Sequence, residues 1–198
     1  MIIRHHIIYV PGLGDDLYRL QSLAIKLWRL WGVNGHTHPM PWSSDETFDS
    51  KLARLLTEVD RYLDQGHNVS LVGASAGASA VLHAYAQRRT KIAGLVYLCG
   101  KINHPQTVSK HSYSQNPGFK QSLETLPKAL EQLGTKDRSK IMSLYSIKDG
   151  SVPYRDTLID QVLESRLPAL RHPYAILWAI TFGARKPILF LKQTAEQM

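Results

Sequence analysis

The chain of 198 residues is long enough for one domain with a well-buried core and too short for two ordinary domains, so we expect a single domain over residues 1–198. Hydrophobic residues make up 43% and charged residues 20% of the sequence, which excludes a disordered or fibrous chain. Lys and Arg total 24 against 16 acids, and the resulting formal charge of +8 could favour anionic substrates, nucleic acid or anionic lipid.

The N-terminal residues and the single cysteine bear on the cellular compartment. Arg4, His5 and His6 interrupt the first apolar residues and no small-residue cleavage site follows, so this segment predicts a strand and not a signal peptide. No uncharged apolar run approaches the roughly 18 residues of a membrane span, and we expect a soluble, cytoplasmic protein. Cys99 has no partner for an intrachain disulfide and lies in an apolar run, which favours a small buried residue.

Half of the excess positive charge falls in residues 101–140. This stretch has seven basic residues (Lys101, Lys110, Lys120, Lys128, Lys136, Arg138, Lys140) and three acids (Glu124, Glu131, Asp137). A solvated surface is favoured over an anionic-partner site, because Arg-rich arms and aromatic-interleaved basic patches are missing. No nucleic-acid partner is expected.

Strands and helices are predicted to alternate along the chain. An apolar run at 7–10 predicts a strand ending at Pro11, and Asp15 or Asp16 can cap the helix that follows. That helix has apolar residues at helical spacing, and we expect them to form its buried face: Leu17, Leu20, Leu23, Leu27, Leu30 and Trp31.

Later segments repeat the alternation. Strands are predicted at 32–42 (weakly), 68–73, 92–99, 141–147 and 162–170, and helices at about 48–65, 76–89 and 174–182. Such alternation implies βαβ units, so we predict an α/β fold, a three-layer α/β/α sandwich around a mostly parallel sheet.

The motif Gly73-Ala74-Ser75-Ala76-Gly77 runs from a predicted strand into a predicted helix, which is the context that a nucleophile elbow requires. Glycines two residues before and after Ser75 leave room for a sharp turn that exposes the hydroxyl above the carboxyl ends of the strands. The alternative is a helix start rich in small residues that packs closely on the sheet.

A serine nucleophile needs a base, and the base needs an acid to orient it. Asp149 follows the strand predicted at 141–147, so we assign it as the acid, with Asp156 as its nearest rival and an ordinary turn aspartate as the other interpretation. His172 is the one histidine of nine that follows Asp149, and it lies at a strand-to-helix junction, which favours it as the base. No histidine pair has metal-site spacing with a nearby acid, so no metal is expected.

A tetrahedral intermediate also needs backbone N–H donors for its oxyanion. Ala76 directly follows the nucleophile, and Leu13 lies between Gly12 and Gly14 in the loop after the first strand, so their N–H groups are the predicted oxyanion hole. A plain glycine turn is the alternative for this loop.

The order Ser75, Asp149, His172 resembles the α/β-hydrolase superfamily, in its small serine-esterase and lipase-like branch. Pro11 stands where that family's oxyanion loop has histidine. We expect the family's first antiparallel strands to be missing, so the resemblance implies a compact version. In such proteins the segment corresponding to 101–140 commonly forms a lid. Here it has apolar residues for an underside: Tyr113, Phe119, Leu123, Leu126 and Leu130.

The resemblance implies cleavage of a small carboxylic ester through an acyl-enzyme, without a cofactor. An acyltransferase, a thioesterase or an amidase would use the same triad, and an inert relative could bind a partner through the same cleft. A nucleotide-binding protein is a remote alternative: Gly12-Leu13-Gly14 follows a strand, but the third glycine of the dinucleotide motif and the ribose-binding acid are missing. The sequence leaves the acyl group, the leaving group and the oligomeric state open.

Overall fold

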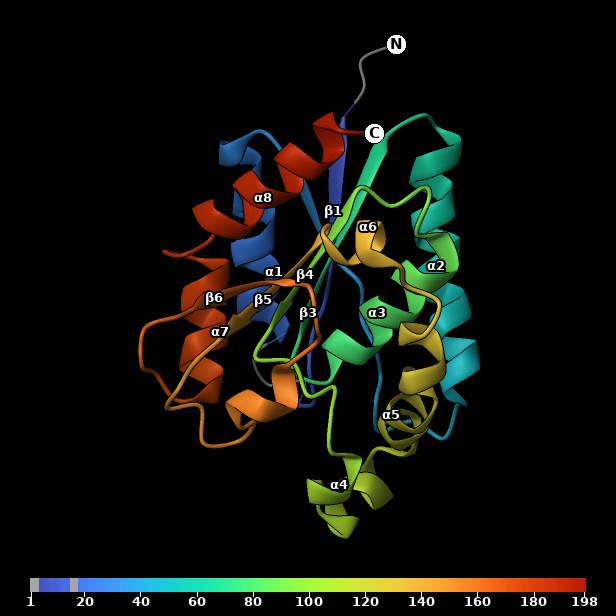
Figure 1. Cartoon of the computed structure of the whole chain (residues 1–198), viewed down its shortest axis with the longest axis vertical. Coiled ribbons are helices and arrows are strands. Elements are labelled where there is room, and N and C mark those ends of the chain that lie inside the picture. Colours follow the sequence, from blue (N-terminus) through green and yellow to red (C-terminus); the bar gives the residue numbers. More distant parts are fainter. Residues whose placement is uncertain (1–3, 15–17) are drawn as a thin grey trace.

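The computed structural model describes residues 4–14 and 18–198, which form a six-stranded sheet flanked by helices (Figure 1). The strands are β1 (His5–Val10), β2 (Asn34–Thr37), β3 (Asn68–Ala74), β4 (Gly94–Leu98), β5 (Ile141–Tyr145) and β6 (Leu163–Arg166). Their order is β2-β1-β3-β4-β5-β6, and all neighbouring strands are parallel. The carboxyl ends of all six therefore lie at one edge of the sheet.

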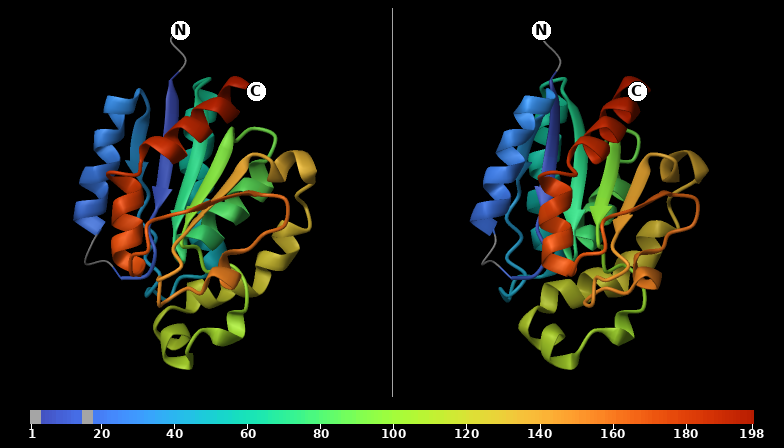
Figure 2. Two further views of the ribbon diagram at one scale, coloured as in Figure 1. Left: turned by 60° about the vertical axis from the view of Figure 1, so that its left-hand side comes forward. Right: turned by 90° about the vertical axis from the view of Figure 1, so that its left-hand side faces the viewer.

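Helices cover both faces of this sheet (Figures 1 and 2). One face carries α1 (Tyr18–Lys26), the short 3₁₀ helix η1 (Leu27–Trp31), α7 (His172–Ile180) and α8 (Arg185–Glu196). The other carries α2 (Phe48–Asp64), α3 (Gly77–Arg88) and α5 (Pro117–Leu130). Shorter helices are η2 (Pro105–Thr107), α4 (Lys110–Gln115), α6 (Thr135–Arg138) and η3 (Tyr154–Thr157). The predicted three-layer α/β/α architecture is confirmed.

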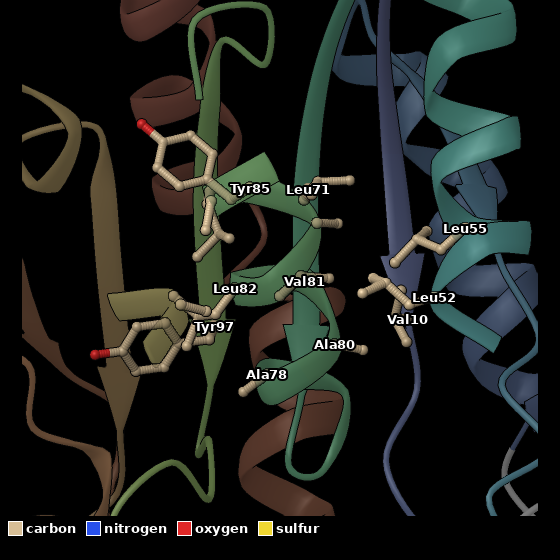
Figure 3. Packing of buried hydrophobic residues seen from close by; sticks show 14 of the residues in the cluster. Val10, Leu52, Leu55, Leu71, Ala78, Ala80, Val81, Leu82, Tyr85 and Tyr97 are labelled. Carbon is tan, nitrogen blue, oxygen red and sulfur yellow. The ribbon is translucent and has the colours of Figure 1, made fainter. Parts of the chain in front are cut away.

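The alanine-rich helix α3 packs closely on the sheet and forms the centre of the larger core cluster (Figure 3). Leu71 of β3, Val81 and Leu82 of α3 and Leu55 of α2 are fully buried there. Small residues at the start of α3 bring its axis near the strands, which places the turn before it at the carboxyl edge.

The predicted buried face of the first helix is wrong. Ala24, Ile25 and Trp28 are the residues that pack against the sheet and α7, and the Trp28 indole donates a hydrogen bond to the Ile180 carbonyl at 2.9 Å. The leucine row therefore points to solvent, and its exposed members are Leu20, Leu23, Leu27, Leu30 and Trp31. Both rows have helical spacing, so periodicity could not choose between them. Leu17 and the predicted caps Asp15 and Asp16 lie outside the described residues.

A larger part of residues 101–140 belongs to the hydrophobic core than the predicted lid implies. Phe119, Leu123 and Leu126 of α5 are buried in the cluster with α2 and α3, so α5 belongs to the helical layer. The part that projects beyond the carboxyl edge is α4 with its connecting loops (Figure 1). The C-terminal helix α8 was not predicted.

No single helix in the described ranges is long and apolar enough to cross a membrane; α7 and α8 meet the criterion of length and composition only as a pair bent by 56°.

Stability should fall as the pH decreases from about 6.5 to about 4, because two histidines of β1 resist protonation when folded. Burial, followed by the charge of Lys192, lowers the pKa of His5 from 6.5 to about 4. Burial, followed by His36 and His67, lowers the pKa of His6 from 6.5 to about 4. The unfolded chain then binds more protons across this window, so the unfolding free energy decreases with falling pH. Urea unfolding from pH 7 to 4 measures this slope. Equal slopes in the wild type and in a His5→Gln/His6→Gln variant would contradict the assignment.

Candidate active site

Ser75 sits in the tight turn between β3 and α3 with a backbone φ of 51°, a left-handed conformation that is strained for a residue with a side chain. Its N–H donates to the Leu98 carbonyl at 2.9 Å, which ties the turn to the end of β4. A Cβ at Gly77 would overlap the Val10 carbonyl, and one at Gly73 would lie 2.5 Å from the Gly77 carbonyl oxygen. Neither position of the motif has room for a side chain, so both need glycine.

His172 and Asp149 form a hydrogen-bonded pair at the same edge of the sheet. Asp149 follows β5, His172 begins α7, and the ring Nδ1 lies 2.7 Å and 2.9 Å from the two carboxylate oxygens. The His172 backbone N–H also donates to the Asp149 carbonyl at 2.9 Å, so two contacts fix the histidine relative to the acid.

The Asp149 carboxylate is buried and held ionised. It accepts backbone N–H groups of Ser151 at 2.9 Å and Val152 at 2.6 Å in addition to the histidine. Burial by itself would raise the pKa of Asp149, but the hydrogen bonds from His172 and Val152 outweigh it and hold this pKa below its usual value.

The rival acid Asp156 is engaged elsewhere. Its carboxylate is fully buried and lies 2.5 Å from Lys101 Nζ and 2.9 Å from His104 Nδ1. Its backbone carbonyl accepts the N–H groups of Ile102 and Asn103. The structure thus places Asp149 at His172, and Asp156 at the base of the loop after β4.

The loop after β1 lies directly against Ser75. A Cβ added to Gly12 would be 2.7 Å from Ser75 Cβ and 3.4 Å from its Oγ, and Gly14 has φ 87°. The Trp42 indole donates to the Pro11 carbonyl at 3.3 Å, which helps to fix the position of the loop. Within residues 4–14 and 18–198, the backbone N–H groups of Leu13 and Ala76 have no hydrogen-bond acceptor.

Similar solved structures share this architecture. One of the metagenome-derived lipolytic enzymes LipS and LipT superposes with a TM-score of 0.71 at 11% identity, covering 96% of this chain and 94% of that one. Est1E from Butyrivibrio proteoclasticus gives 0.69 at 15% identity, covering 94% and 89%. The chain adopts the α/β-hydrolase fold. Alpha/beta hydrolase domain-containing protein 10 from mouse also matches, with a TM-score of 0.58 at 15% identity over 92% of this chain and 89% of that one. No family model and no curated protein sequence matches the chain.

Cys99 is a residue of the candidate site that the sequence analysis missed. It follows β4 with φ 48°, and its sulfur lies within 4.8 Å of an Asp149 carboxylate oxygen. Burial, followed by the negative charge of Asp149, raises the pKa of the thiol. One ligand atom each from Cys99, Asp149 and His172 lie within 4.8 Å of one another, a spacing that could also hold a metal ion. The signal was available, because Cys99 ends a predicted strand at the edge that carries Ser75 and Asp149.

A hollow of about 810 Å³ opens beside Asp149 and His172. Asp149, His172, Arg171 and Tyr174 are among its lining residues, whereas Ser75 is not. The Ser75 hydroxyl has no hydrogen-bond partner within the described ranges, so the structure contains a contact between His172 and Asp149 but none between His172 and the Ser75 hydroxyl.

Proposed function

We propose that this chain is a serine hydrolase that cleaves a carboxylic ester, with Ser75 as the nucleophile, His172 as the base and Asp149 as the orienting acid. The observation that carries the proposal is the 2.7 Å contact between His172 and a buried, ionised Asp149, at the edge where the strained Ser75 turn lies. Strain and a preorganised acid–base pair at one edge are typical of catalytic sites.

The reaction follows from the roles of these atoms. Asp149 accepts a hydrogen bond from the Nδ1–H of His172, which leaves Nε2 unprotonated and able to take the Ser75 proton as the hydroxyl oxygen attacks the ester carbonyl. The N–H groups of Leu13 and Ala76 would stabilise the resulting oxyanion. The protonated His172 then gives its proton to the leaving alcohol. His172 then takes a proton from a water molecule as that water attacks the acyl-enzyme. When the bond between the acyl group and Ser75 Oγ breaks, His172 returns this proton to Oγ and the carboxylic acid product leaves.

The segment after β4 borders this site in our proposal. The Lys101 N–H donates to the Ser75 carbonyl at 3.3 Å, so the projecting part of 101–140 begins at the nucleophile. Because α5 belongs to the core, we restrict the proposed lid to about residues 101–116. Thioester or amide hydrolysis and acyl transfer would use the same groups.

A substrate panel tests the proposal. The purified chain should hydrolyse p-nitrophenyl esters of increasing acyl length. The kcat/KM for these esters should be well above the value for p-nitroanilides of the same acyl groups, because p-nitroaniline is a poorer leaving group than p-nitrophenol. Turnover of an acyl-thioester with none of any ester would assign the site to thioesters. Turnover of no member of the panel would contradict the proposal.

A further inference from the structure

The helical layer formed by α1, η1, α7 and α8 exposes an unusual amount of apolar surface. Of the twelve large apolar side chains exposed in the described part of the chain, eight lie on this layer or on its α7–α8 turn, and none lies on α2, α3 or α5. The eight are Leu20, Leu23, Leu27, Leu30, Trp31, Tyr174, Phe182 and Leu189. Figure 2 shows these helices together on one face of the sheet. Exposed apolar side chains that gather on one face of a protein indicate a candidate docking site.

The same layer is strongly basic. Its four helices carry six Lys or Arg residues and one acid, Glu196, whereas α2, α3 and α5 together carry six Lys or Arg residues and five acids. The two layers carry equal numbers of basic residues, but the apolar layer has a net charge of +5 and the other layer a net charge of +1.

Charge and apolar side chains are interleaved along α1 and η1. Leu20, Leu23, Leu27 and Leu30 follow one another at intervals of three or four residues and are all exposed; Leu30 is 78% exposed. Exposed basic residues flank this row (Arg19, Lys26 and Arg29), and Trp31 ends it. A helix with leucines, an interfacial tryptophan and flanking Lys and Arg is typical of segments that lie in the plane of a bilayer surface.

A hollow of about 520 Å³ adds apolar depth to this layer. It lies beside α8, where Trp178, Phe182 and Leu189 line it together with Arg185 and Lys186. Phe182 is 88% exposed at its rim. The apolar side chains of this hollow could contact lipid acyl chains, and the neighbouring cationic side chains could bind anionic lipid headgroups.

We propose that the layer of α1, η1, α7 and α8 docks on an anionic lipid surface. A second copy of the chain fits less well, because two such faces would bring six Lys or Arg residues against six others. Anionic headgroups instead complement this charge, and each Lys or Arg near such a surface strengthens binding about fivefold. Docking does not depend on the chemistry of Ser75, so a Ser75→Ala variant should bind equally.

Vesicle flotation with the full chain tests this proposal. The chain should float with vesicles of equal parts phosphatidylcholine and phosphatidylglycerol, should not float with phosphatidylcholine alone, and should be released as salt screens the headgroups. Arg19→Gln/Lys26→Gln/Arg29→Gln should weaken binding on the order of a hundredfold. Leu23→Gln/Leu27→Gln/Leu30→Gln should abolish binding while thermal unfolding stays unchanged, because these leucines contribute little to the core.

The matched control removes the same charge from another surface. Lys110, Lys128 and Lys136 are exposed on the 101–140 segment, and Lys110→Gln/Lys128→Gln/Lys136→Gln should keep most of the vesicle binding. Equal loss in both charge variants would overturn the proposal, as would equal flotation with the two lipid mixtures. A dimer in solution that the leucine variant dissociates, without vesicle binding, would assign the face to a second copy instead.

Discussion

Replacing Ser75 with alanine should lower kcat for a short p-nitrophenyl ester by roughly 10⁴- to 10⁶-fold, because the hydroxyl that forms the acyl-enzyme is removed. The fold should be retained, since Ser75 is only partly buried and its backbone N–H still reaches Leu98. Initial rates of p-nitrophenol release, with circular dichroism to check folding, measure the effect.

Ser79 provides the matched control, one helical turn further on. It is fully buried and its hydroxyl lies 2.8 Å from the Ala76 carbonyl and 2.7 Å from Ser122 Oγ, so its role is structural. Ser79→Ala should cost about 1 kcal/mol of stability and leave kcat within a few-fold. If Ser79→Ala removed activity while Ser75→Ala kept it, the nucleophile would be misassigned.

An Asp149→Asn variant should lower kcat by roughly 10⁴-fold with little change in KM. The amide cannot hold the Nδ1 proton of His172 as the ionised carboxylate does, so the imidazole no longer presents an unprotonated Nε2 to Ser75. Asp149 is ionised across neutral pH because its pKa lies below the usual value, so this loss should persist from pH 6 to 8. Steady-state kinetics over that range measures it.

The Asp156→Asn variant distinguishes the roles of the two acids. It should lower the free energy of unfolding and leave kcat nearly unchanged, whereas Asp149→Asn should lower kcat. Asp156 is the buried carboxylate partner of Lys101, and breaking a buried pair typically costs about 3–5 kcal/mol. The folded fraction of this variant should keep kcat within a few-fold. A large loss of kcat in a stable Asp156→Asn chain, with Asp149→Asn active, would reverse the assignment.

The sequence was sufficient for the architecture and for the order of the candidate site residues. Alternating strand and helix patterns predict the parallel sheet, because each buried strand is an apolar run bounded by turn residues. Gly73 and Gly77 mark the elbow around Ser75, because no side chain fits at either position.

Other features depend on contacts between distant segments. The helical segment of α1 and η1 has two rows of apolar side chains at helical spacing. The row that contains Trp28 is the buried one, because Trp28 donates a hydrogen bond to Ile180, which is far away in the sequence. Asp149 and Asp156 follow the same strand, and only the fold shows which one lies at His172 and which at Lys101. The apolar residues of α5 fit a lid underside or a core equally well until their neighbours are known.

Labelling with a fluorophosphonate probe tests the central claim most directly. The proposed mechanism predicts one covalent adduct per chain by intact mass, located on Ser75 by peptide mapping, reduced in Asp149→Asn and absent in Ser75→Ala. An adduct on another residue, or no adduct on a folded wild-type chain, would contradict the assignment of Ser75 as an activated nucleophile.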